Sequence, residues 1–384
     1  LRPCYGKAPE NSAAPAVLHA LAQDQAVAQA WRSLAARARV EEHRLRLEAL
    51  PPEARLAQGG PYDGLLLAGP AQEFLASLLA DPERRKLSPS ALETYVACPM
   101  QWFLARMLGL AEPSEPGWDL ERSEEGTWVH ETLKRFFAPG EFDSTWDEAA
   151  QGDRLARCLA QAMEKLPGHG LVQQARQGVL AHTLITVVAR EMEAMGGLRP
   201  AKVEADFGGK ESEAPPLEVP LDQGQPLRLT GRLDRLDQGQ GALRVVDYKH
   251  ASQKEKISGP LKETELGLTA FQMPVYLAAA RELWGRAKDA LSARVVPTRK
   301  MEQEPMQRDF APGDPLLAAD PAIRRELLQS GAPNLFNSIV ELWSRLEGGR
   351  FMPLPEQGPC DFCQMGGVCR ARVNAAAALE GEAS

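Results

Sequence analysis

The stretch that decides the fold reads Gly231-Arg-Leu-Asp-Arg-Leu-Asp-Gln-Gly-Gln-Gly-Ala-Leu-Arg-Val-Val-Asp-Tyr-Lys249. Apolar and polar residues alternate on both sides of a Gln/Gly cluster at 238–242, and this pattern predicts two strands joined by a tight turn. The first strand is expected over 228–237 and the second over 243–249. The stretch therefore predicts a β-hairpin in which Asp234 and Asp247 lie on adjacent strands.

Two carboxylates placed in this way can share one hard divalent cation, which takes oxygen ligands. Lys249 follows Asp247 by two residues, so both side chains leave the same face of the strand. A lysine in that place can orient an attacking water and offset the negative charge that grows on a phosphate. Alone, this hairpin is weak evidence, because Asp and Lys on strands are more often solvated edge residues.

Other polar residues accompany the hairpin. His130 belongs to an expected helix and has apolar neighbours, and Glu204 lies in the expected first strand of the sheet. Gln272 and Tyr276 are four residues apart on another expected helix, so they project from one face. Taken singly, His130 and Tyr276 are as compatible with core packing, and Glu204 with a surface charge, as with a site.

The remaining pattern favours an α/β fold. Further strands are expected near 203–207 and 291–298, helices over 126–137, 145–195 and 269–285, a loop over 111–125, and helices from there to the end of the folded region. Ser88 is expected to cap a helix that begins at Pro89, with Ser90-x-x-Glu93 as a second capping option.

Composition limits the kind of protein. The chain has 384 residues, which suggests two to three folded units, and its formal charge of −8 excludes a globally basic nucleic-acid coat. Residues 225–256 nevertheless carry seven Lys/Arg against four Asp/Glu, a local surplus of three positive charges. No apolar run approaches the roughly 20 residues of a membrane helix. No phosphate-binding loop of the G-x-x-x-x-G-K-S/T type is present, so this segment is not expected to be a helicase motor.

The cysteines are too sparse for a disulfide scaffold, which favours a reducing cytoplasm. Cys360, Cys363 and Cys369 are spaced so that three thiolates can converge on one centre, and Cys98 is the expected fourth ligand. The lone-plus-three arrangement favours iron–sulfur, while zinc and a set of unrelated thiols remain open. Cys158 is expected to be an ordinary buried thiol.

Several motifs in order resemble one family. They are Ser-Pro-Ser-Ala-Leu-Glu-Thr-Tyr-x-x-Cys-Pro (88–99), Gly-Thr-x-x-His (126–130), Gly-Arg-Leu-Asp-Arg-Leu-Asp (231–237), Val-Asp-Tyr-Lys (246–249) and Gln-x-x-x-Tyr (272–276). This order is similar to RecB-type nucleases of the PD-(D/E)XK superfamily. The terminal Cys-x2-Cys-x5-Cys resembles the iron-staple variant found in the AddB subunit of AddAB helicase–nucleases and in CRISPR-associated RecB-like nucleases. The superfamily's namesake proline is absent, because Leu233 holds its place.

The resemblance implies a restriction-endonuclease-like core, a central mixed β-sheet flanked by helices, with extra helical segments. It implies a Mg²⁺ or Mn²⁺ site and a 4Fe-4S cluster on the four cysteines, with zinc as the less favoured occupant. The implied metal ligands are His130, Asp234, Asp247 and the backbone carbonyl of Tyr248. Lys249 is implied as the catalytic lysine, Glu204 as a further acidic member, and Gln272 and Tyr276 as residues that line the site and contact the nucleic acid.

The implied division is a helical N-terminal segment over 1–84, the end of a preceding domain. A nuclease domain over 85–372 carries a helical insertion at about 140–200 and the cysteine cluster, and a polar tail covers 373–384. The expected activity is metal-dependent hydrolysis of DNA, exonucleolytic on single-stranded or unwound ends in recombinational repair, with a helicase subunit or domain as partner and no membrane partner. A non-catalytic nucleic-acid-binding or scaffolding module and a zinc-stapled protein with another role are the alternatives.

Overall fold

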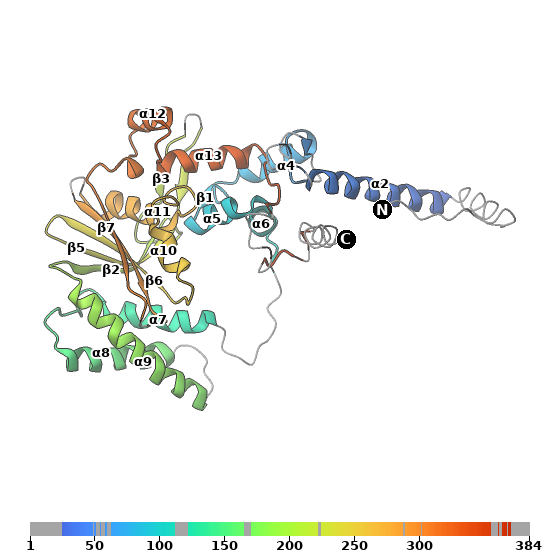
Figure 1. Ribbon diagram of the computed structural model, residues 1–384. Helices are drawn as coiled ribbons and strands as arrows, with labels where there is room; N and C mark the ends of the chain where they lie inside the picture. The colour runs from blue at the N-terminus through green and yellow to red at the C-terminus, as the bar shows by residue number, and fades with distance from the viewer. Residues whose placement is uncertain are drawn as a thin grey trace.

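The computed structural model describes most of the chain: residues 25–48, 50, 54, 58–59, 63–111, 122–164, 170–221, 224–286, 289–300, 302–354, 360, 363–366 and 368–369. Its centre is a five-stranded sheet with helices packed on both faces (Figure 1). None of the helices in these ranges is both long and apolar enough to cross a membrane.

The strands of the central sheet are β2 (Arg199–Phe207), β5 (Gly231–Gly239), β6 (Ala242–Lys249), β7 (Ala290–Pro297) and β8 (Met306–Phe310), in the order β2-β5-β6-β7-β8. β6 and β7 are parallel, and the other neighbours are antiparallel. A parallel pair needs a long crossover connection, and here the segment with α10 (Glu255–Ser258) and α11 (Gln272–Ala279) supplies it. The predicted mixed sheet flanked by helices is confirmed.

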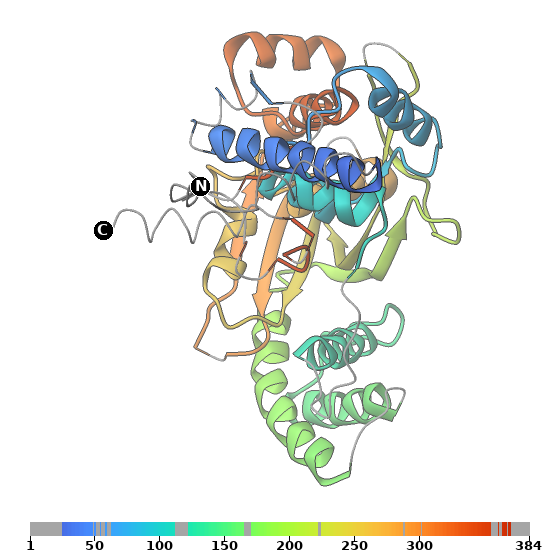
Figure 2. The same cartoon turned by 90° about the vertical axis from the view of Figure 1, so that its right-hand side faces the viewer.

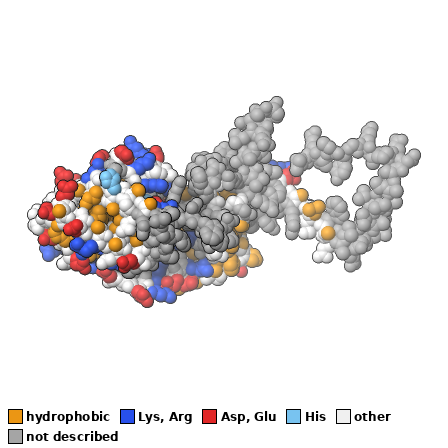
Figure 3. Space-filling view, turned by 90° about the horizontal axis from the view of Figure 1, so that it is seen from below, with side chains coloured by type: hydrophobic (Ala, Val, Ile, Leu, Met, Phe, Trp, Pro, Cys, Tyr) orange, Lys and Arg blue, Asp and Glu red, His pale blue; other side chains and the backbone are white. Residues whose placement is uncertain are grey.

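One face of the sheet is covered by α7 (Arg122–Phe136), α8 (Glu148–Glu164) and α9 (Gly170–Glu193). Their apolar residues form one core cluster with Val246, Tyr248 and Val296 from the sheet. Figure 2 shows the three helices as a separate layer at one end of the molecule. Figure 3 views this end from outside, where positive and negative side chains are interspersed rather than gathered by sign.

The other face carries α5 (Pro89–Ala97), α11 and its π-helical continuation η4 (Ala280–Trp284), with α4 (Gly69–Leu79) and α13 (Leu335–Glu347) packed outside them (Figure 1). The other helical elements are α2 (Gln25–Glu48), α6 (Pro99–Trp102), η2 (Phe103–Met107), η3 (Gly259–Leu261), η5 (Pro315–Leu317) and α12 (Pro321–Ser330). The predicted cap of α5 is confirmed, because the Ser88 hydroxyl accepts a hydrogen bond from the N–H of Ala91 at 3.2 Å.

The predicted turn of the hairpin is also present. Gln240 and Gly241 both have positive φ, 51° and 76°, which is the backbone of the two-residue turn that matches the twist of antiparallel strands. Such a turn fixes the register of β5 against β6, with Arg235 opposite Val246 and Asp237 opposite Arg244. The register sets where the acidic residues of the two strands come to lie.

Three sequence expectations are corrected. The strand predicted over 228–237 is two strands, since β4 (Leu227–Leu229) joins a small sheet with β1 (Lys86–Leu87) and β3 (Leu217–Val219) before β5 begins at Gly231. A Cβ on Gly231 would lie 2.8 Å from Tyr276, so the chain passes a point where only glycine fits. β8 was expected to be helical; its sequence is polar because it is an edge strand, mostly exposed. α7 begins at Arg122, four residues before the expected start.

Candidate active site

The residues predicted for the site meet in one cavity of about 1030 Å³. The cavity lies where β5 and β6 end, between α7 on one side and α5 and α11 on the other. All eight predicted residues outside the cysteine set line it: His130, Glu204, Asp234, Asp247, Tyr248, Lys249, Gln272 and Tyr276. Side chains from positions far apart in the chain are therefore brought to a common space.

Three of these residues form a group with metal-binding geometry. One ligand atom each from His130, Glu204 and Asp234 lie within 4.8 Å of one another, and the His130 Nδ1 is 3.4 Å from the Asp234 Oδ1. An imidazole and two carboxylates are a ligand set that suits hard and borderline divalent ions. The residues present therefore fit the divalent ion that the sequence implied, and Glu204, the least certain of the predicted residues, lies at the centre of the group.

A local break in the strand pattern places Glu204 there. Its φ is 48°, a left-handed backbone that is strained for a residue with a side chain. Ala205 and Phe207 belong to the core cluster on the α11 side, whereas Val203 packs on the α7–α9 side, although strict alternation would put all three on one face. The alternation shifts at Glu204, next to the point where Asp234 lies on β5.

Asp247 and Lys249 form a second unit with Gln272. The Gln272 amide donates to the Asp247 Oδ1 at 2.9 Å, and its carbonyl oxygen accepts from the Lys249 Nζ at 2.6 Å. The Lys249 Nζ also lies 2.9 Å from the Asp247 Oδ2. An ammonium has three donors, so these two contacts leave one N–H that can point into the cavity. Asp247 does not belong to the group of three close ligands, although it lines the same cavity.

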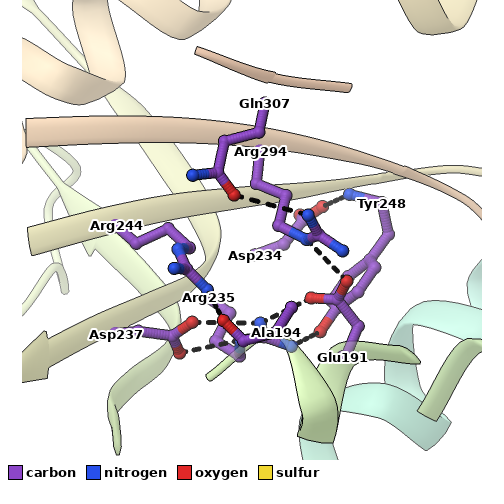
Figure 4. Close-up of polar contacts among 9 residues, drawn as sticks. All are labelled: Glu191, Ala194, Asp234, Arg235, Asp237, Arg244, Tyr248, Arg294 and Gln307. Atoms are coloured by element: carbon purple, nitrogen blue, oxygen red, sulfur yellow. Dashed lines mark hydrogen bonds and ion pairs between the residues drawn. The ribbon is translucent and has the colours of Figure 1, made fainter. Parts of the chain in front are cut away.

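Tyr248 connects this site to the opposite face of the sheet. Its backbone N–H donates to the Asp234 Oδ2 at 2.7 Å, which fixes one oxygen of that carboxylate. Its side chain turns away from the cavity, and its hydroxyl accepts a hydrogen bond from Arg235 (Figure 4).

Arg235 is the centre of a buried ionic network. It is 1% exposed and donates two hydrogen bonds to Asp237, at 2.8 and 3.0 Å, and one to Glu191 of α9 at 2.7 Å. Glu191 also accepts from Arg294 of β7 at 2.7 Å (Figure 4). Breaking a buried network of this kind leaves uncompensated charge, which costs several kcal/mol. The network therefore ties α9, β5 and β7 together behind the cavity.

Electrostatics in the cavity favour a cation. Burial, and then the negative charge of Asp234, raise the pKa of Glu204, and burial is also the main cause that raises the pKa of Asp247. Burial alone would lower the pKa of His130, but the hydrogen bond to Asp234 and the charges of the carboxylates nearby outweigh it and raise the pKa. These shifts have one origin: negative groups crowded together away from water, a situation that a bound divalent ion relieves.

Sequence reasoning did not identify three further polar residues of the cavity: Glu93, Arg232 and His250. Glu93 belongs to the Ser90-x-x-Glu93 pattern, but its side chain accepts from the backbone N–H of Phe271 and Gln272 instead of capping its own helix. Arg232 pairs with Asp206 at 2.6 Å and with Glu204 at 3.3 Å. Only the position next to Lys249 marks His250, which lies 3.5 Å from Glu125 of α7.

The four cysteines predicted as cluster ligands differ in burial. Cys98 is buried between α5 and α6, and Cys360, Cys363 and Cys369 are partly exposed. Among the residues described, His130, Glu204 and Asp234 are the one set of three potential ligands whose atoms lie within 4.8 Å, so the cysteine sulfurs are not drawn together to that extent. The iron–sulfur cluster stays a prediction. Cys158 is buried in α8, as expected.

Comparison with known proteins gives a consistent result. A family model described as "PD-(D/E)XK nuclease superfamily" matches residues 86–370. Two curated relatives are both named as the AddB-type subunit of an ATP-dependent helicase/deoxyribonuclease. That of Moorella thermoacetica is 32% identical over 259 residues, covering 61% of this chain and 21% of the relative. That of Symbiobacterium thermophilum is 27% identical over 428 residues, covering 100% of this chain and 36% of the relative.

The chain thus spans about a fifth to about a third of the length of these relatives. A solved structure titled "Crystal structure of SSO0001" matches with a TM-score of 0.31 and 12% identity over 79% of this chain and 98% of that one, a likeness too slight to bear on function. The match over residues 86–370, on a mixed sheet with an acidic and imidazole-containing cavity, shows that the chain belongs to the PD-(D/E)XK nuclease superfamily and that its nuclease domain is distantly related to AddB of the helicase/deoxyribonucleases.

Proposed function

We propose that this chain is a metal-dependent deoxyribonuclease that hydrolyses phosphodiester bonds in DNA and leaves a 5′-phosphate and a 3′-hydroxyl. The observation that carries the proposal is the cavity in which His130, Glu204 and Asp234 lie within ligand distance of one another beside the Asp247–Lys249–Gln272 unit. Family membership supports the reaction class, and the relatives' name supports DNA as the substrate.

We propose His130, Asp234, Asp247 and the backbone carbonyl of Tyr248 as the residues that hold Mg²⁺ or Mn²⁺, with Glu204 as a further acidic ligand. A divalent ion held there would polarise the phosphate oxygens and lower the pKa of a water molecule. The chain's own residues do the rest. Lys249, kept in place by Asp247 and Gln272, directs its remaining N–H to the attacking water or to a phosphate oxygen.

Gln272 and Tyr276 have supporting roles in the proposal. Gln272 contacts both Asp247 and Lys249, so it keeps the carboxylate and the ammonium in one relative orientation. Burial raises the pKa of Tyr276 to about 12, so its hydroxyl stays protonated and can donate to the nucleic acid. Both residues come from α11, which therefore contributes positioning rather than ligands.

We further propose that the activity is exonucleolytic on single-stranded or unwound ends, in recombinational repair. Residues 85–372 would be the nuclease domain, with the helical insertion at about 140–200, after a helical segment over 1–84 and before the tail at 373–384. The family match to 86–370 and the relatives' helicase/deoxyribonuclease name support this assignment. A helicase subunit or domain is the proposed partner that delivers the unwound strand.

The spacing of Cys98, Cys360, Cys363 and Cys369 supports a 4Fe-4S cluster as a structural staple. Anaerobic purification followed by iron and zinc analysis and a visible absorption spectrum tests it. Four irons per chain with a broad absorption band near the violet would support the cluster, and one zinc or no metal would contradict it.

The nuclease assay is the main test. End-labelled single- and double-stranded DNA is incubated with Mg²⁺, Mn²⁺ or EDTA, with wild type beside Asp247→Ala, Lys249→Ala and Asp309→Ala. Asp309 is an exposed aspartate on β8, away from the cavity, and serves as a matched control. Removing Lys249 is expected to slow cleavage about 10²–10³-fold. Full activity of both Asp247→Ala and Lys249→Ala, or DNA binding without cleavage at any metal concentration, would leave the non-catalytic alternative.

A further inference from the structure

A second hollow of about 410 Å³ lies beside the catalytic cavity. Its wall is formed by β1, the start of α5, η2 and the residue that precedes β5. A volume of this order is at the lower end of the range of sites for small molecules, enough for one nucleotide. No role in the reaction described above uses it.

The two hollows are neighbours along the same two segments. Thr230 lines the second hollow, and Arg232, two residues on, lines the catalytic cavity. Gly231 between them faces Phe207 and Tyr276, so Thr230 and Arg232 share the opposite side of the chain. On α5, Ala91 lines the second hollow and Glu93 the catalytic cavity. Two residues of strand span roughly 7 Å, so an extended ligand that leaves one hollow enters the other.

The second hollow is positively charged. Arg84, Lys86 and Arg106 line it with one acidic residue, Glu83, a surplus of two positive charges. Glu83 pairs with Lys86 at 2.8 Å, so the surplus belongs to the two arginines. This contrasts with the catalytic cavity, where the four carboxylates of Glu93, Glu204, Asp234 and Asp247 outnumber the three cations Arg232, Lys249 and Lys256.

The two guanidinium groups are held beside each other without a carboxylate partner. Arg84 donates to the backbone carbonyl of Met107 at 3.1 Å, which places it next to Arg106 in η2. In the part of the chain that the structure describes, neither guanidinium forms an ion pair, and Arg106 is exposed. In a chain with a net charge of −8, such cations suit an anion from outside the chain.

The rest of the wall fits the remainder of a nucleotide. Leu87, Met107 and Trp102 form an apolar side, and Ser88 and Thr230 add hydroxyl groups. Trp102 is only 3% exposed and stacks on Phe351, so it supplies apolar surface rather than an open stacking platform. Apolar surface on one side and guanidinium groups on the other match the sugar and base of a nucleotide and its phosphate.

We propose that this hollow, the Arg84–Arg106 pocket, binds a nucleotide of the DNA strand whose scissile bond lies in the catalytic cavity. The guanidinium groups of Arg84 and Arg106 contact a backbone phosphate, and the apolar wall contacts the sugar and base. The pocket thereby holds the strand on one side of the cut and sets the direction in which it lies. This inference rests on the proposed function for its substrate.

Binding of DNA without cleavage tests the pocket directly. Asp247→Ala serves as the parent, and the affinity for a fluorescein-labelled oligothymidylate of about 20 nucleotides is measured over a range of salt concentrations. Adding Arg106→Glu is expected to weaken binding about tenfold at ~0.1 M salt and to reduce the salt slope by about 0.7 for the lost phosphate contact. Arg106→Gln is expected to give a smaller loss in the same direction.

The matched control is Arg325→Glu, which makes the same charge change on the exposed side of α12. A loss of affinity of the same size in Arg325→Glu and Arg106→Glu would overturn the proposal, because it would reflect net charge alone. In the otherwise wild-type chain, Arg106→Glu is expected to keep the wild-type rate on thymidine 5′-p-nitrophenyl phosphate, which is too short to reach the pocket, and a slowed rate would count against the proposal. If no variant cleaves any substrate, the proposed nuclease fails while the binding comparison still decides the pocket.

Discussion

The carboxylate of Glu93 in α5 accepts the backbone N–H of Gln272 in α11 at 2.9 Å, across 179 positions of sequence. It accepts the N–H of Phe271 at the same distance. The first N–H groups of a helix lack partners within the helix, so Glu93 caps α11 from a different helix. Gln272 in turn contacts Asp247 and Lys249, and the orientation of the catalytic pair therefore depends on a residue that touches neither of them.

This relationship predicts a positioning role for Glu93. Glu93→Ala is expected to lower kcat about tenfold through a displaced Gln272, with the Mg²⁺ concentration for half-maximal activity unchanged, and to cost about 1 kcal/mol of unfolding free energy as a lost helix cap. Steady-state kinetics on single-stranded DNA and urea unfolding measure the two effects. Glu93→Gln retains an acceptor oxygen and should recover most of kcat. Equal loss in both variants would mean that the charge, not the cap, matters.

The two histidines of the cavity allow a matched comparison. His130 lies 3.4 Å from Asp234 among the carboxylates, whereas the ring of His250 contacts Thr298 at 3.2 Å and Glu125 at 3.5 Å. We expect His130→Ala to raise the Mg²⁺ concentration for half-maximal cleavage about 10–100-fold, the loss typical when a group that holds or orients a metal is removed.

His250→Ala, at the same cavity, should shift that concentration less than threefold. Mn²⁺ binding followed by electron paramagnetic resonance checks the shift without relying on cleavage. If His250→Ala weakened Mn²⁺ binding and His130→Ala did not, the ligand assignment would move to the other histidine.

Arg235 is predicted to matter for stability more than for chemistry. Replacing it with leucine leaves Glu191 and Asp237, both completely buried, without their cation. Removing one partner of a buried pair typically costs about 3–5 kcal/mol. Chemical unfolding of Arg235→Leu beside Arg157→Leu, an exposed site on α8, should show that difference. An effect below about 1 kcal/mol would mean that the two carboxylates become protonated or hydrated at little cost.

Sequence pattern predicted much of this site because its central residues are local. Asp234 and Asp247 are joined by a two-residue turn, and Gln272 and Tyr276 share one helix face, so spacing alone limits where they point. The contacts of Glu93, and of Glu191 with Arg235, join residues 178, 179 and 44 positions apart, and no periodicity records such pairs. β8 was missed for a related reason, because an edge strand buries little and its sequence keeps few apolar positions.

The left-handed backbone of Glu204 predicts a conflict between stability and activity. With a φ of 48° this residue carries strain of about 1 kcal/mol, and its buried carboxylate lies close to Asp234. Glu204→Gly removes both the strain and the repulsion, so the unfolding free energy should stay the same or rise by up to about 1 kcal/mol, even though its contact with Arg232 at 3.3 Å is lost. Cleavage should nevertheless fall at least about 100-fold, because a metal-binding oxygen is gone. Glu204→Ala separates the two effects: it also removes the carboxylate but keeps the strain, so it should be equally inactive and less stable than Glu204→Gly. An active Glu204→Gly would show that this carboxylate does not take part in the reaction, and a Glu204→Gly less stable than Glu204→Ala would show that the backbone there is not strained.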